Sequence, residues 1–247
     1  MSAHAPWTVL LRHGHSEWNL TDRFTGWTDI PLTEVGLAEA AAAGRKLAQA
    51  GFVFDEVHGS VLVRTRQTAD ALLAAMRTPG VPFFSSWRLN ERHYGALQGM
   101  NKREIFATWG EEASRRWWRG YHEPPPPLER DDPRHPRFDP HYAGLDSCEL
   151  PASESLRDCQ RRTLPYWHDV VAPRLAAGRR LLVISHGNTL RGLVMHLDGL
   201  SPEAMEKVEI ASGVPLVYRF DETGRVLGRE WLAMGGDRGE GAAPTAL

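Results

Sequence analysis

The chain of 247 residues has few of the features that mark secreted, membrane-bound or nucleic-acid-binding proteins. Its only cysteines, Cys148 and Cys159, exclude a disulfide framework and a cysteine-based metal site. We expect free thiols, with a single disulfide as the alternative. Residues 1–6 do not resemble a signal peptide, and no apolar stretch is long enough to span a bilayer. The formal net charge of −2 gives no general attraction to nucleic acid. We therefore expect a cytoplasmic protein whose anion sites must come from local clusters of cations.

Two His-Gly dipeptides each follow an apolar run. Residues 7–11 precede Arg12 and His13, and residues 181–184 precede Ser185 and His186. Such runs predict buried parallel strands, and open α/β sheets bind ligands beyond the carboxyl ends of their strands. If the two strands are neighbours, both histidines enter one pocket. Two imidazoles beside arginines favour phosphoryl transfer through a histidine.

Helical and strand patterns alternate along the rest of the chain. We expect helices over residues 34–50, 60–76, 101–118, 153–177, 188–198 and 202–210. Further strands are expected over residues 52–59 and 81–84, and a hairpin over 214–220 and 225–232. This order predicts one three-layer α/β/α domain over residues 1–234 with a mostly parallel sheet. The Gly- and Ala-rich residues 235–247 predict a disordered tail.

Proline is concentrated in residues 120–151, which hold eight of the 17 prolines. This density excludes regular helix and inner strand. Long irregular segments within compact domains are usually lids, binding loops or disorder. We expect this segment to be a cap over the site, with an ordinary surface loop as the alternative.

The residues around His13 suit a histidine nucleophile, which must be neutral, oriented and close to cations. Arg12 precedes it, and Ser16 and Asn19 offer hydrogen-bond donors in the following loop. Arg64 stands near the start of an expected helix, where its guanidinium can grip phosphate oxygens with two N–H groups.

Two further segments supply the remaining chemistry. Residues 88–95 combine an acid, cations and an aromatic hydroxyl, and Glu91 is the candidate proton shuttle. Gly187 and Asn188 begin an expected helix whose free N–H groups favour an anion. His186 and the arginines would position the phosphoryl group and stabilise its charge.

Five segments together resemble the cofactor-dependent phosphoglycerate mutases of the histidine phosphatase superfamily. They are LRHG at 11–14 with SEWN at 16–19, RFTGW at 23–27, LNERHYGALQG at 89–99 with NK at 101–102, HGN at 186–188 with LR at 190–191, and GVPLVY at 213–218. The resemblance covers residues 7–232. One such motif alone would be weak, but five in the family's order are specific.

The resemblance implies interconversion of 3-phosphoglycerate and 2-phosphoglycerate in glycolysis and gluconeogenesis. His13 would carry a phosphoryl group loaded from 2,3-bisphosphoglycerate, Glu91 would be the general acid and base, and His186 would stabilise the phosphoryl in flight. No metal is implied, and relatives of this kind are commonly oligomers, so we expect a homodimer. The implied phosphate- and carboxylate-binding residues are Arg12, His13, Ser16, Asn19, Thr25, Gly26, Arg64, Glu91, Arg92, Tyr94, Lys102, Arg119, Gly187 and Asn188.

The chain departs from the family pattern at two positions. His15 stands where the family usually has glutamate, so a negative group near the phosphate is lost. Trp118 stands before Arg119 where the family usually has two adjacent arginines. Arg115 and Arg116 are candidates to replace the missing cation.

Several alternatives compete with the mutase hypothesis. A phosphatase or bisphosphoglycerate synthase of the same fold is the nearest. A catalytically silent binding module and a metallo-hydrolase using His13, His15 and His4 are the others. We expect Trp109, Trp117 and Trp118 to pack in the core or the cap rather than to hold a ligand.

Overall fold

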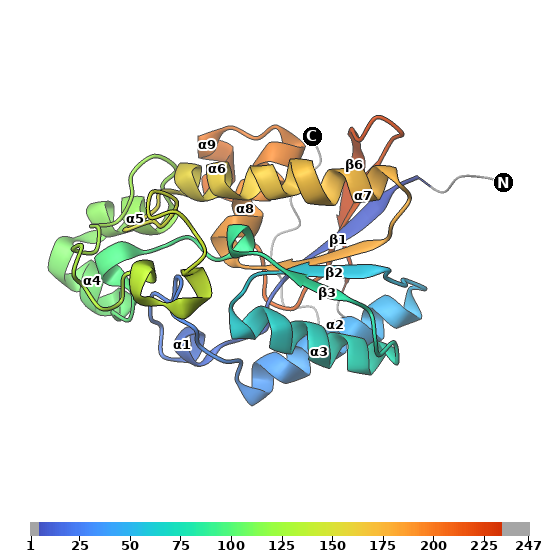
Figure 1. Cartoon of the computed structure of the whole chain (residues 1–247), viewed down its shortest axis with the longest axis horizontal. Coiled ribbons are helices and arrows are strands. Elements are labelled where there is room, and N and C mark those ends of the chain that lie inside the picture. The colour runs from blue at the N-terminus through green and yellow to red at the C-terminus, as the bar shows by residue number, and fades with distance from the viewer. Residues whose placement is uncertain (1–4, 234–247) are drawn as a thin grey trace.

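A six-stranded sheet forms the centre of the computed structural model, which describes residues 5–233 (Figure 1). Its order is β3-β2-β4-β1-β5-β6. The strands are β1 Trp7–Arg12, β2 Glu56–Gly59, β3 Phe83–Ser85, β4 Leu181–Ser185, β5 Leu216–Phe220 and β6 Val226–Trp231. β3, β2, β4 and β1 are parallel, whereas β5 and β6 are antiparallel. The predicted mostly parallel sheet and the terminal hairpin are confirmed.

The two strands that precede the His-Gly dipeptides are neighbours. β1 pairs with β4 in parallel, and Arg12 lies opposite Ser185. Both strands are buried along their apolar runs, residues 9–11 and 181–184, as expected for inner strands of a sheet covered on both faces. His13 and His186 therefore leave the same edge of the sheet at the same level.

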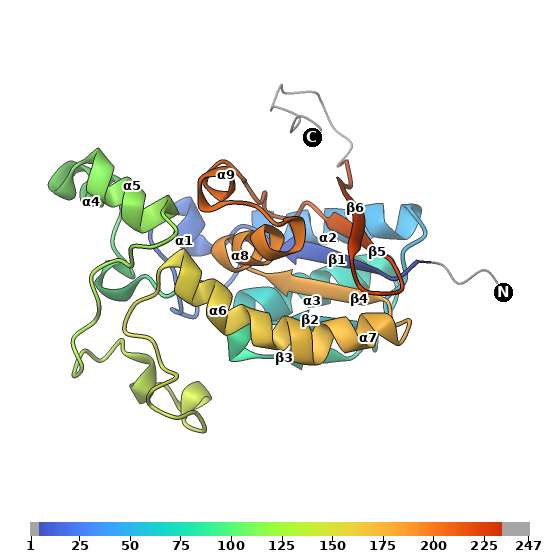
Figure 2. The same ribbon diagram turned by 90° about the horizontal axis from the view of Figure 1, so that it is seen from above.

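Helices cover both faces of the sheet (Figures 1 and 2). One face carries α2 Glu34–Gln49 and α3 Val63–Met76, which pack with β1 and β4 in one apolar core. The other carries α6 Leu156–Tyr166, a π-helical turn Trp167–Val171, α7 Ala172–Ala176, α8 Gly187–Asp198 and α9 Pro202–Glu206. A second apolar core lies beneath α7 and α8. The predicted three layers are confirmed.

The helix expected over residues 101–118 is divided. α4 Lys102–Trp109 and α5 Glu111–Arg119 meet at Gly110, whose φ of 80° is incompatible with a continuous α-helix. The helix expected over 153–177 begins only at Leu156, where Ser155 forms the capping box. A short helix within the loop after β1, α1 Glu17–Leu20, was not predicted.

α4, α5 and the proline-rich segment 120–151 project beyond the carboxyl ends of β1 and β4 (Figure 2). The proline-rich segment contains only two short 3₁₀ turns, Pro136–Phe138 and Pro140–Tyr142, as its composition predicts. Within the described residues, no helix has the length and apolarity of a membrane span. Cys148 and Cys159 are free thiols. The predicted disordered tail lies outside the described residues.

Candidate active site

His13 is held as a neutral imidazole directly beyond β1. Its Nδ1–H donates to the carbonyl of Gly14 at 2.7 Å, so Nε2 is the nitrogen left for a ligand. Burial, followed by the charges of Arg64 and Arg12, holds the pKa of His13 well below its usual range. The loop lies tightly on α2, because a Cβ on Gly14 would stand 2.2 Å from the Gly36 carbonyl oxygen. An unprotonated, oriented ring in this place is suited to nucleophilic attack.

His186 lies against His13 from the neighbouring strand. The ring centroids are 4.9 Å apart with an interplanar angle of 62°. Arg64 Nε donates to His186 Nδ1 at 3.2 Å, so His186 Nε2 carries the proton and donates to the hydroxyl of Ser60 at 2.8 Å. Burial, followed by the charge of Arg64, holds the pKa of His186 well below its usual range. Ser60 was not predicted, although its place directly after β2 could have indicated it.

Glu91 enters the site from the segment after β3. Its Oε1 accepts the N–H of Arg92 at 2.8 Å and the N–H of Asn188 at 3.1 Å. Asn188 lies in the first turn of α8, where free N–H groups and the helix dipole stabilise an anion. The carboxylate is thereby fixed at the wall of the same hollow as His13.

His13 and Glu91 lie in the wall of a cavity of about 200 Å³, which is smaller than the roughly 300–1,000 Å³ typical of drug-sized pockets. Its wall contains six cationic side chains and two carboxylates. The described wall is formed by Arg12, His13, Asn19, Arg23, Phe24, Thr25, Gly26, Arg64, Glu91, Tyr94, Lys102, Trp118, Arg119, Gly187, Asn188, Arg191, Glu209, Ile210 and Ala211. A small, strongly anionic ligand fits this wall.

The cations carry donors that the protein itself does not use. Among the described residues, Arg12 Nε and Arg191 Nε are buried without a hydrogen-bond partner. Arg64 donates once from each nitrogen, to His186 Nδ1 and two backbone carbonyls, which leaves two of its five N–H groups for a ligand. Burial lowers the pKa of Arg64 to about 10; burial and the charge of Arg119 lower that of Arg191 to about 10. A bound anion would relieve this crowding of positive charge.

Arg23 and Arg191 were missing from the predicted site. Arg23 donates to the Gly99 carbonyl at 2.6 Å, and Arg191 donates to Asn188 Oδ1 at 3.0 Å. Both stood within the recognised segments, and Arg191 follows Asn188 by one turn of an expected helix. That spacing was the available signal.

The cavity wall that the structure describes does not include Ser16, Arg92 or His186. The Ser16 hydroxyl donates to Asn19 Oδ1 at 2.9 Å and so orients Asn19. Arg92 Nη2 donates to the carbonyls of Trp117 and Trp118, each at 2.8 Å, and thereby holds the end of α5. These three side chains are placed to support residues that line the cavity.

The two departures from the family pattern have different structural consequences. The backbone N–H of His15 donates to Glu39 Oε2 at 2.9 Å, and its ring is not part of the described wall. Trp118 does line the cavity, and the Arg119 guanidinium stacks 4.5 Å from its ring centroid. The indole packs in the cap against the cluster of Phe24 and Tyr94, as expected, and it also forms part of the cavity wall.

Neither Arg115 nor Arg116 compensates for the missing arginine in the described wall. Arg115 lies 3.9 Å from Glu111, and Arg116 pairs with Glu112 and Glu123. Both guanidiniums are drawn to acids on α5 and just beyond it. Trp109 and Trp117 form the expected aromatic packing, with centroids 5.5 Å apart.

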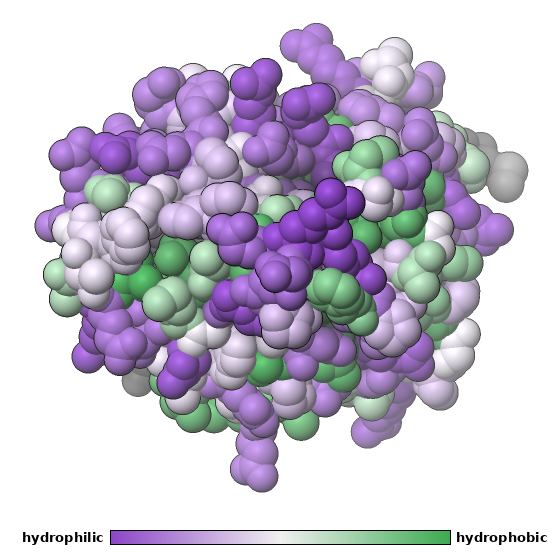
Figure 3. All heavy atoms as spheres, turned by 60° about the vertical axis from the view of Figure 1, so that its left-hand side comes forward, coloured by the Kyte–Doolittle hydropathy of each residue, from purple (hydrophilic) through white to green (hydrophobic). Residues whose placement is uncertain are grey.

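The cavity is covered by α4 and α5 rather than by the proline-rich segment. Lys102 and Arg119 come from these helices, whereas the described wall contains no residue of 120–151. The proline-rich segment supports the site from behind, where the Tyr142 hydroxyl accepts the Asn90 amide at 2.8 Å. This end of the molecule is mainly hydrophilic, with scattered hydrophobic side chains (Figure 3).

Over residues 5–233, no three His, Cys, Asp or Glu side chains are grouped so that they could hold a metal ion. His4, one of the alternative ligands, lies outside the described residues. Positive charge at this site comes from the guanidiniums and Lys102.

Comparison with known proteins agrees with this geometry. A family model described as "Histidine phosphatase superfamily (branch 1)" matches residues 8–137 and 129–230. A 2,3-bisphosphoglycerate-dependent phosphoglycerate mutase of Nitratidesulfovibrio vulgaris is 54% identical over 224 residues, which cover 91% of this chain and 90% of the relative.

Solved structures of lower identity share the fold. Bacillus stearothermophilus YhfR has a TM-score of 0.68 at 22% identity, covering 89% of this chain and 93% of its own. A mycobacterial glucosyl-3-phosphoglycerate phosphatase in complex with VO3 has a TM-score of 0.64 at 25% identity, covering 87% and 92%.

Proposed function

This chain belongs to branch 1 of the histidine phosphatase superfamily, and on that premise we propose that it interconverts 3-phosphoglycerate and 2-phosphoglycerate through a phosphohistidine at His13. The reaction belongs to glycolysis and gluconeogenesis. The observation that carries the proposal is the neutral His13 in a small cavity with six cations and a fixed carboxylate. The mutase from N. vulgaris, 54% identical, supports the choice of substrate.

We assign each residue the role that its position in this geometry supports. His13 Nε2 attacks the phosphorus, and the bond from phosphorus to the leaving oxygen breaks as the bond to nitrogen forms. Glu91 gives a proton to the leaving oxygen and takes one from the accepting hydroxyl in the reverse direction. Arg12 and Arg64 hold the phosphoryl oxygens, since phosphoryl transfer depends mainly on positioning and charge stabilisation.

His186 and Ser60 support this step from behind His13. His186 Nδ1 accepts from Arg64, so the ring orients the guanidinium that faces the phosphoryl group. To contact the phosphoryl group as predicted, the His186 ring would have to give up its hydrogen bond with Arg64 or with Ser60. That role stays a prediction.

The residues fit 2,3-bisphosphoglycerate as the priming cofactor. The orphaned Nε atoms of Arg12 and Arg191 and the two remaining N–H groups of Arg64 suit a ligand with several anionic groups. Lys102 and Arg119 would hold its carboxylate or second phosphate from the cap. When bound, the cofactor supplies the first phosphoryl group.

A coupled assay with 3-phosphoglycerate tests the proposal. We expect 2-phosphoglycerate to form at a rate that rises with added 2,3-bisphosphoglycerate and is indifferent to a chelator. Release of inorganic phosphate should be minor. If phosphate release dominates over isomer exchange, the chain is a phosphatase of this fold instead.

Two further properties remain predictions. We propose that the chain acts in the cytoplasm, a compartment that suits glycolytic substrates and two free thiols. A homodimer is expected, and sedimentation would test it.

A further inference from the structure

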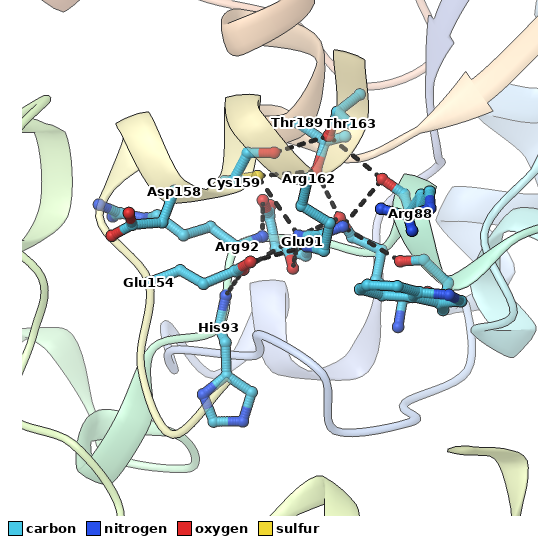
Figure 4. Close-up of polar contacts among 12 residues, drawn as sticks. Arg88, Glu91, Arg92, His93, Glu154, Asp158, Cys159, Arg162, Thr163 and Thr189 are labelled. Atoms are coloured by element: carbon cyan, nitrogen blue, oxygen red, sulfur yellow. Dashed lines mark hydrogen bonds and ion pairs between the residues drawn. The ribbon is translucent and has the colours of Figure 1, made fainter. Parts of the chain in front are cut away.

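Arg162 is a buried arginine that lies outside the cavity wall but next to the Glu91 segment. Its side chain is 6% exposed, and it extends from α6 toward the segment that carries Glu91 (Figure 4). Nε and Nη2 donate to the two carboxylate oxygens of Glu154 at 2.7 and 3.0 Å. Removing both charges from water is costly, so such a pair needs a reason beyond stability.

The remaining N–H groups of Arg162 bind the backbone just before and at Glu91. Nη1 donates to the carbonyls of Trp87 and Arg88 at 3.1 and 2.8 Å. The second N–H of Nη2 is shared between the carbonyls of Asn90 and Glu91, each at 3.2 Å from the nitrogen. One guanidinium thus gathers four carbonyls of five consecutive residues, which lie beyond β3 and outside the sheet.

Glu154 holds the chain on the other side of Glu91. Its Oε2 accepts the N–H of His93 at 2.8 Å, and its side chain is 4% exposed. The carbonyl of Glu91 also accepts from Trp27 Nε1 at 2.6 Å, so the backbone is fixed from three directions. The Glu91 carboxylate remains free to accept the Asn188 N–H at the cavity wall.

We propose that Arg162, clamped by Glu154, is a positioning residue for Glu91. It acts by fixing the backbone from Trp87 to His93, so that the Glu91 carboxyl reaches the leaving oxygen. Lysine cannot replace it, because an ammonium is a point donor that cannot span four carbonyls and a carboxylate. The inference rests on the proposed function only in taking Glu91 as the proton donor.

The chemistry of the leaving group separates this role from a merely structural one. When His13 takes a phosphoryl group from an alkyl phosphate, the leaving oxygen keeps the electron pair of the broken bond and needs a proton from Glu91. With 4-nitrophenyl phosphate, the nitrophenolate leaves as a stable anion without that proton. A misplaced Glu91 therefore slows only the first reaction.

The test compares Arg162→Lys with the wild type in single-turnover phosphorylation of His13. Phosphorylation by 2,3-bisphosphoglycerate is followed by intact mass. Phosphorylation by 4-nitrophenyl phosphate is followed by the burst of released nitrophenolate. We expect the first rate to fall by about 10²-fold, the typical effect of a 1 Å misplacement of a reacting group, and the second to stay unchanged. Arg161→Lys, on the exposed side of the same helix, should change neither.

An equal fall with both donors, or a fall with neither, would overturn the proposal. Glu154→Gln provides a second variant should Arg162→Lys not fold; it keeps a side-chain oxygen for His93 while removing the charge that clamps Arg162, and the same donor selectivity is expected. Failure of the proposed function is seen separately, in the wild type. If 2,3-bisphosphoglycerate does not phosphorylate His13, the comparison is made with 3-phosphoglycerate as the alkyl donor.

Discussion

Replacing Glu209 by glutamine should tighten substrate binding, because its carboxylate competes with substrate anions for Arg119. Arg119 Nη2 lies 2.9 Å from Glu209 Oε1, across the mouth of the cavity that both residues line. The segment that bears Glu209 is held by Arg12, which donates to the neighbouring Ile210 carbonyl at 2.9 Å. A substrate carboxylate or phosphate therefore competes with Glu209 for Arg119.

The exposure of the pair sets the size of the effect. The Arg119 side chain is 25% exposed and that of Glu209 is 79% exposed, so water screens much of their attraction. Exposed pairs contribute about 0.2–1 kcal/mol, which corresponds to a change of about 1.4- to 5-fold in binding. We expect KM for 3-phosphoglycerate to fall by this factor while kcat stays unchanged.

Steady-state kinetics at low and high salt check the reasoning. At roughly 1 M salt the screening length is about 3 Å, and the difference between Glu209→Gln and wild type should nearly disappear. Glu222→Gln removes the same charge from the exposed turn between β5 and β6 and should leave KM unchanged. A higher KM in Glu209→Gln, or an equal fall in both variants, would refute the competition.

Three other predictions test the site and its surroundings. Glu91→Gln should slow isomer exchange by about 10²–10⁴-fold. The fold should stay intact, since the glutamine oxygen still accepts the backbone N–H groups of Arg92 and Asn188. Unchanged turnover would remove Glu91 from the mechanism. Below pH 6.5 the folded chain binds fewer protons at His13 and His186 than the unfolded chain, because burial depresses both pKa values. Between pH 6.5 and 5 the free energy of unfolding should therefore fall by up to about 1.4 kcal/mol per pH unit per histidine, while NMR of the folded chain should detect no protonation of His13. A His13 ring that titrates near pH 6.5 in the folded chain contradicts a neutral His13. A thiol reagent should label Cys148 in the native protein and Cys159 only after denaturation. Cys159 is buried, and burial raises its pKa to about 12. Labelling of both cysteines in the native protein would contradict this packing.

The layers and the mostly parallel sheet were predictable because they depend on local patterns. Continuous apolar runs identified β1 and β4, and Thr33 and Ser201 cap α2 and α9 as N-cap chemistry requires. The break at Gly110 was missed, because a single glycine is often tolerated within a helix and only its positive φ reveals the turn.

The site was predictable in its chemistry but not in its contacts. His13, Glu91 and Arg64 stand in recognisable segments, and the structure brings them to one cavity. The inward position of Arg92 was not predictable, since it depends on the carbonyls at the end of α5, a helix boundary that the sequence did not reveal. The clamp by Arg162 depends on contacts across more than 70 residues of chain, which no local pattern encodes.

The central claim is that His13 carries the phosphoryl group. Intact-mass analysis after incubation with 2,3-bisphosphoglycerate tests it most directly. The wild type should gain one acid-labile phosphoryl group that maps to His13, and His13→Ala should gain none. A wild type without the adduct, or an adduct that persists in His13→Ala, would contradict the account.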